Sequence, residues 1–144
     1  MIEQDTIKLL RETDAGIAMG ISAIDEVIDY VYDAELKAVL TSSKDEHNKM
    51  KEEVQNLLDR YNDDGKEPNP IAKGMSWMKT NVMLIMNESD ATIADLITDG
   101  CNMGVKSLNK YLNKYKAAEE KAKDITKKLI KMEEELAKDV KCYL

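Results

Sequence analysis

The chain has 144 residues, of which 43% are hydrophobic and 34% are charged, a balance that is typical of a globular protein rather than a disordered one. Its formal net charge of −7 argues against nucleic acid and membrane surfaces as partners, because both are anionic and would repel an acidic protein. This length predicts a single domain over residues 1–144, and the abundance of Glu, Lys, Leu and Ala favours long helices.

Apolar residues at alternating steps of three and four predict a pair of long helices, a helical hairpin, over residues 4–61. The first inward-facing stripe consists of Ile7, Leu10, Asp14, Ile17, Ile21, Ile24, Ile28 and Val31. The second consists of Leu36, Leu40, Ser43, His47, Met50, Val54, Leu57 and Tyr61. The five-residue step from Val31 to Leu36 fits neither heptad step, so we predict a turn near residues 30–34.

Residues 62–88 are predicted to form a long crossover that contains a short helix. The crossover opens with NDDGKEPNP, residues 62–70, which is the clearest loop signal in the chain. At about 1.5 Å per residue, a largely helical segment of this length would reach roughly 40 Å, the length of a long helix. Its sulfur-rich and aromatic side chains are either a cover for the bundle or candidates for a protein interface: Met75, Trp77, Met78, Met83 and Met86.

A second hairpin is predicted over residues 89–142, with helices over about 89–114 and 117–142. The inward residues of the first helix are Ala94, Thr98, Cys101, Val105, Leu108 and Leu112. Those of the second are Ala122, Ile125, Leu129, Met132, Leu136 and Val140, so this stripe is expected to be entirely apolar. The phase of the pattern slips only mildly near residue 115, and one continuous helix over 89–142 is the alternative.

The two hairpins show an internal repeat. GIAMG at residues 16–20 matches GCNMG at residues 100–104, a shift of 84 positions, and the apolar pattern that follows keeps this register. We interpret the repeat as a duplication, the alternative being chance similarity between amphipathic helices. Glycines four residues apart remove side chains from one strip of a helix, so we expect a close helix–helix approach with methionine filling the gap beside it. The alternative is that the glycines mark a bend.

Two hairpins joined by a long crossover resemble the ferritin-like superfamily, and most closely a bacterial branch of ferritin-like domains of unknown function. The features that carry the resemblance are the first hairpin, the loop NDDGKEPNP, the Trp-containing crossover GMSWMKTNV at residues 74–82, and the second hairpin. The resemblance covers nearly the whole chain and implies an all-α, up-down four-helix bundle with one long crossover.

Metal-binding ferritin-like proteins hold two ions at the bundle centre with a Glu from each of two helices and a Glu-x-x-His from each of the other two. This chain has a single His, and Lys44 stands three residues before His47 where that motif has Glu. The family pattern carries over only to Asp14 and His47, with Glu46 and Asp99 as possible helpers. We therefore predict no metal or other cofactor. The alternative is a ferritin-like metal-binding protein, or a di-metal oxidoreductase, with a degenerate site for iron or manganese.

Asp14 and His47 are more simply interpreted as a buried polar pair, joined by a hydrogen bond or an ion pair, or as wet residues at the edge of their stripes. A nucleophilic arrangement of Ser43, His47 and Asp14 lacks an evident oxyanion hole. A buried Cys101 would be an inert, small hydrophobic residue. No catalytic residue is therefore predicted.

The predicted function is that of a non-catalytic helical bundle that acts through a protein partner or through self-association, for example as a homodimer. A cytoplasmic location is expected. The first residues, MIEQDTIKLLRETD, carry acids where a secretory signal needs basic and then apolar residues. Cys101 and Cys142 lack metal or redox spacing and are expected to be free thiols.

Overall fold

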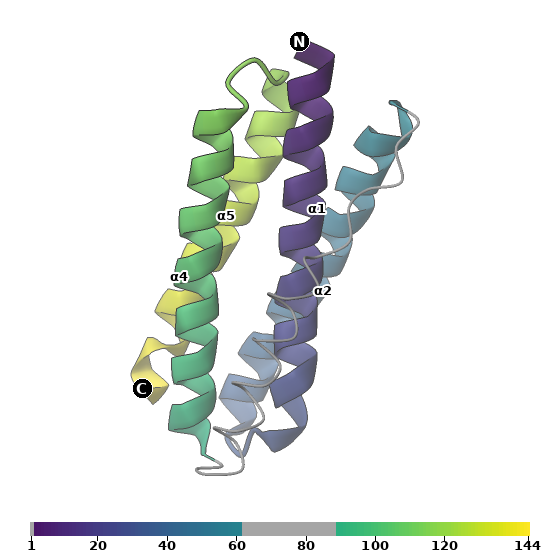
Figure 1. The fold of residues 1–144 in the computed structure, drawn as a ribbon. Helices are drawn as coiled ribbons and strands as arrows, with labels where there is room; N and C mark the ends of the chain where they lie inside the picture. The colour runs from purple at the N-terminus through teal and green to yellow at the C-terminus, as the bar shows by residue number, and fades with distance from the viewer. Residues whose placement is uncertain (1, 62–88) are drawn as a thin grey trace.

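The protein was analysed as a computed structural model, which describes residues 2–61 and 89–144. All regular secondary structure in these two ranges is helical, so the all-α prediction is confirmed for them. The long helices are α1 (Ile2–Val27), α2 (Ala34–Asp59), α4 (Asp90–Lys114) and α5 (Glu120–Val140), shown in Figure 1. Two short 3-10 turns follow α1 and α5, namely η1 (Ile28–Tyr30) and η2 (Lys141–Tyr143). The predicted crossover, with its five interface candidates, lies outside the described residues.

The turn predicted near residues 30–34 is present. After η1 the backbone becomes extended, and Asp33 begins α2 as its N-cap by accepting a hydrogen bond from the Leu36 N–H at 3.0 Å. This cap satisfies one of the backbone donors that a helix leaves unpaired at its start. A capping carboxylate therefore separates α1 from α2 without help from glycine or proline.

The break between α4 and α5 is also present, so the continuous helix over 89–142 is wrong. The Tyr115 N–H donates to the Tyr111 carbonyl at 2.8 Å and closes the last turn of α4. Side chains from the start of α1 then satisfy the turn: the Ala117 N–H donates to Asp5 at 3.1 Å, and the Glu119 N–H donates to Thr6 at 2.8 Å. The turn depends on these contacts from α1 in addition to its own sequence.

Hydrogen bonds at the helix ends give the direction of each helix. The N–H groups of Tyr32 and Asp33 donate to the Asp90 carboxylate at 2.8 and 2.9 Å, which places the α1–α2 turn beside the start of α4. The Tyr61 hydroxyl donates to Glu119 at 2.8 Å, which places the end of α2 beside the start of α5. As Figure 1 shows, α1 and α5 run in one direction, and α2 and α4 run in the other.

The buried apolar residues form two clusters along the length of the helices. One contains residues such as Leu10, Ile17 and Leu129, and the other contains residues such as Ile24 and Leu36. On every helix the buried residues of the two clusters are separated by about two to three turns, and these gaps contain residues 20, 47, 104 and 133. Among the described residues, no helix combines the length and the apolar character that crossing a membrane requires.

Candidate functional site

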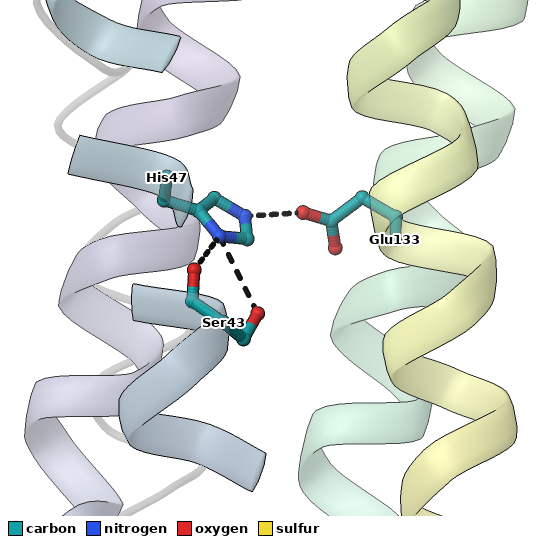
Figure 2. A network of polar contacts seen from close by, with 3 residues as sticks. All are labelled: Ser43, His47 and Glu133. Atoms are coloured by element: carbon teal, nitrogen blue, oxygen red, sulfur yellow. Dashed lines mark hydrogen bonds and ion pairs between the residues drawn. The ribbon is translucent and has the colours of Figure 1, made fainter. Parts of the chain in front are cut away.

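The region between the two apolar clusters is polar, and His47 lies at its centre. The His47 side chain is fully buried on the inward stripe of α2, as its heptad position predicted. Its Nε2 lies 2.6 Å from Glu133 Oε1 on α5, and its Nδ1 lies 2.7 Å from the carbonyl oxygen of Ser43, one turn earlier on α2. Figure 2 shows the imidazole ring between these two oxygen acceptors.

The two acceptors favour the doubly protonated, charged form of the imidazole. A backbone carbonyl can only accept a hydrogen bond, so Nδ1 carries a proton, and the Glu133 carboxylate accepts from Nε2. Burial alone would lower the pKa of His47. The hydrogen bond and negative charge of Glu133, the Ser43 carbonyl and the charge of Glu46 outweigh burial, so the pKa of His47 is raised. The central contact is therefore a buried ion pair between imidazolium and carboxylate.

Helix α4 contributes Cys101, a member of the second apolar cluster that borders this region and contacts Glu133. Burial, followed by the charge of Glu133 and a hydrogen bond with it, raises the pKa of the Cys101 thiol far above its usual range. A thiol held neutral in this way is a poor nucleophile and a poor metal ligand. The expectation that Cys101 is buried is confirmed. The other thiol, Cys142, is free and exposed.

Of the four glycines in the part of the chain that the structure describes, Gly20 and Gly104 lie beside the ion pair. A Cβ atom at Gly20 would be 2.9 Å from both Cδ2 and Nε2 of His47, which is closer than real Cβ contacts. A Cβ at Gly104 would be 3.9 Å from Cγ and Oε2 of Glu133, an ordinary contact. We call Gly20, His47, Cys101, Gly104 and Glu133 together the central polar layer. Each of the four long helices contributes to it.

Gly16, Gly100 and Met103 contradict the interpretation that the glycines allow a close helix–helix approach with methionine filling the gap. A Cβ at Gly16 would make ordinary contacts of 3.8 Å with Leu108 and Leu129, and a Cβ at Gly100 would have nothing within 4 Å. Met103 is 68% exposed, so it does not fill a gap in the core. Among the four, only Gly20 is required by its surroundings, and what it accommodates is the His47 ring rather than a second helix.

Asp14 does not pair with His47. Its side chain is buried, as the heptad predicted, but its carboxylate lies 3.5 Å from the Lys51 ammonium group. Both nitrogens of His47 are engaged elsewhere, and Glu133 is the carboxylate that orients the ring. The Ser43 hydroxyl is 3.5 Å from His47 Nδ1, a weak contact, and Asp14 is not the orienting group that the nucleophilic alternative needs.

Glu133 is the site residue that the sequence analysis missed, and the apolar stripe assigned to α5 is wrong at this point. Thr126 and Glu133 are both buried, whereas Met132 is only half-buried. A signal was present, because Leu129, Glu133 and Leu136 are separated by steps of four and three. Met132 was chosen as the inward residue because it is more hydrophobic than Glu133. In the structure Glu133 is the buried residue, because its carboxylate pairs with the His47 cation on the facing helix.

The other proposed metal ligands do not gather at the centre. Glu46 and Asp99 are exposed, and Asp14 is paired with Lys51. Within residues 2–61 and 89–144, no three His, Cys, Asp or Glu side chains are placed to hold a metal ion. The residues of the central polar layer therefore do not fit the carboxylate-rich ligand set of a di-metal centre.

The raised pKa of His47 predicts how stability depends on pH. A histidine with a raised folded-state pKa contributes its full stabilisation below its unfolded pKa of about 6.5 and loses it as the pH rises through the folded value. The free energy of unfolding should therefore contain a component that falls above about pH 6.5. Urea titrations across this pH range measure it.

Glu133→Gln is the matched control for this prediction, since it keeps the shape and a hydrogen-bonding group but removes the charge. The fall above pH 6.5 should disappear in this variant. A fall of equal size in Glu133→Gln and in the wild type would show that the contact between His47 and Glu133 is not its source.

The chain matches no protein-family model, no curated protein and no solved structure in the three comparisons. Any role for the central polar layer has to be inferred from its geometry and charge.

Proposed function

We propose that this chain is a ferritin-like, up-down four-helix bundle that acts without catalysis, through association with a protein partner or with a second copy of itself. The directions of the helices support the architecture. The end of α2, beside Glu119, and the start of α4, beside Tyr32, are at opposite ends of the helices. Each hairpin then packs with antiparallel neighbours, which is the arrangement that a single long crossover produces.

The observation that carries the non-catalytic part is the ion pair at the bundle centre. His47 donates from both nitrogens and has no lone pair left for a metal ion or for a proton from a substrate. Glu133 supplies the balancing negative charge inside the protein. The imidazolium thus stands at the place where a metal-binding bundle would carry cationic ions.

Exposed aromatic side chains support a role in association. Tyr30 and Tyr32 are 42% and 73% exposed and lie two residues apart at the α1–α2 turn. Tyrosine is enriched at protein interfaces because its ring offers a large apolar area and its hydroxyl can form hydrogen bonds. Met75, Trp77, Met78, Met83 and Met86 remain interface candidates from the sequence. A cytoplasmic protein partner or a homodimer is the expected assembly.

Metal analysis and light scattering test this function together. Protein purified without chelator should contain well under one equivalent of tightly held metal per chain, also after iron(II) or manganese(II) is added. Light scattering of the same sample, alone and with proteins that it co-purifies with, should show a complex larger than one chain. More than one equivalent of bound iron or manganese would instead favour the alternative, a metal-binding protein or oxidoreductase with a degenerate site.

A further inference from the structure

The outer groove between α2 and α5 is hollowed in two places. The two helices run in opposite directions (Figure 1), so the first half of α2 lies beside the second half of α5. A hollow of 310 Å³ lies between these halves, and a hollow of 410 Å³ lies between the other two. Ser42 and Glu46 line the first, and Glu53, Asn56 and Arg60 line the second. These residues are separated by heptad steps, so both hollows open on one face of the bundle.

Each hollow has apolar side chains that are only half-buried. Val39 and Met132 are half-buried in the smaller hollow, and Leu57 is half-buried in the larger one. Apolar area of this kind is stabilised when a second surface removes it from water. The α2–α5 face therefore has apolar area to offer to a partner at two points along its length.

The two hollows differ in charge. The smaller one is named the acidic hollow, because its charged lining residues are all carboxylates: Glu46, Glu135 and Asp139. The larger one is named the basic hollow, because cations outnumber carboxylates in its lining, which contains Arg60, Lys121, Lys128, Glu53 and Asp124. One face thus carries an excess of each charge at opposite ends.

Most of these charges are not neutralised by the part of the chain that the structure describes. In the basic hollow Lys128 lies 3.5 Å from Glu53. Neither Arg60 nor Lys121 forms an ion pair with another described residue, and the three carboxylates of the acidic hollow form none either. Charges of both signs are therefore available on this face for contacts outside the chain.

A second copy of the chain, turned end for end, matches this distribution. A two-fold axis that crosses α2 and α5 midway between the hollows places the acidic hollow of each copy on the basic hollow of the other. Lys121 and Asp139 lie at equal distances on either side of Ile130 in α5. Antiparallel packing of two α5 helices about this level brings Lys121 of each copy to Asp139 of the other. Packing in the same direction would instead place the carboxylates of two acidic hollows together, which is repulsive.

The face is also large enough for a dimer. At 1.5 Å per residue, the groove from residue 38 to residue 60 is about 33 Å long, and two packed helices are about 20 Å wide. The resulting area of about 660 Å² per copy lies within the range of about 600–1,000 Å² per partner that specific interfaces bury.

We propose that the chain forms a two-fold symmetric dimer through its α2–α5 face, with the acidic hollow of each copy against the basic hollow of the other. This inference rests on the proposed self-association and names the surface that carries it. The apolar side chains of the hollows supply the buried area, and the opposite charges set the end-for-end orientation.

Charge reversal at Lys121 and Asp139 tests the orientation. Both residues are exposed, so Lys121→Glu and Asp139→Lys should each fold as the wild type does, which circular dichroism checks. In either variant alone, both symmetry-related contacts become like-charged, and the dimer dissociation constant from sedimentation equilibrium should rise about tenfold. An equimolar mixture should recover the wild-type affinity, because both contacts in the heterodimer again join opposite charges.

Two further variants are the controls. Lys121→Glu/Asp139→Lys in one chain reverses both partners and should form a homodimer as the wild type does. Lys106→Glu makes the same change of net charge at an exposed position on α4, outside the α2–α5 face, and should leave the dissociation constant unchanged. Added salt should weaken the wild-type dimer, because the charges at the contact are partly exposed to solvent.

The outcomes separate this inference from the proposed function. A wild-type dimer that neither single variant weakens, or that the mixture does not restore, would overturn the α2–α5 face as the contact and leave self-association standing. A loss of affinity in Lys106→Glu equal to that in Lys121→Glu would show an effect of net charge and would overturn the pairing of the hollows. Wild-type protein that stays monomeric at every concentration would overturn self-association itself.

Discussion

Gly20→Ala is expected to destabilise the protein by about 3 kcal/mol, an unusually large effect for the addition of one methyl group to a helix. The new Cβ would be 2.9 Å from two atoms of the His47 ring, so the ring has to move. Movement of the ring lengthens its 2.6 Å contact with Glu133 and leaves both charges poorly paired in the core. Urea unfolding at pH 6 measures the loss.

Gly100→Ala is the matched control, because it makes the same change at the first glycine of the repeated motif on α4. A Cβ there has no neighbour within 4 Å, and alanine favours a helix by up to about 1 kcal/mol over glycine. This variant should therefore be slightly more stable than the wild type. Equal effects from the two substitutions would contradict the assignment of Gly20 as the residue that makes room for His47.

His47→Leu should destabilise the protein by about 3–5 kcal/mol, because it leaves the Glu133 carboxylate in the core without its cation. Glu133 is 8% exposed as a residue, so solvent can compensate the lost partner only weakly. The thiol of Cys101 remains beside the carboxylate but carries no charge to balance it. Thermal and urea unfolding at neutral pH measure the difference from the wild type.

His47→Leu/Glu133→Leu is the control that separates charge from packing. Replacing a buried ion pair by apolar side chains of similar size is often neutral or stabilising, so the double variant should recover most of the stability lost in the single one. If the losses of stability measured for His47→Leu and for Glu133→Leu simply add in the double variant, the ion pair is not the source of the effect. In that case packing of the side chains, rather than their charges, would explain how His47 and Glu133 contribute to stability.

The helices and their breaks were largely predictable from the sequence. The heptad stripes placed α1, α2, α4 and α5 within a few residues of their observed ends, since an amphipathic pattern of this length is compatible with little else. The turn before Leu36 followed from a five-residue step in the apolar pattern. The turn after Tyr115 was less certain, because contacts from Asp5 and Thr6, distant in sequence, help to hold it.

The candidate site was only half predictable. The heptad pattern placed His47 and Asp14 in the interior, which is where they lie, but it suggested that they pair with each other. Burial follows from the period of one helix, whereas the partner of a buried side chain depends on how two helices are set against each other. Glu133 was overlooked because Met132 beside it is the more apolar residue.

By itself, the sequence determined the helices of residues 2–61 and 89–144, the position of the turns within these ranges and the inward direction of its one histidine, because each of these follows from local periodicity and capping. Only the tertiary structure decided that His47 pairs with Glu133, that Asp14 contacts Lys51, and that Gly20, alone among the glycines of residues 2–61 and 89–144, has no room for a methyl group. These facts depend on the rotation and offset of neighbouring helices. A repeating apolar pattern leaves both open, since it specifies which face is buried and not which residue lies opposite.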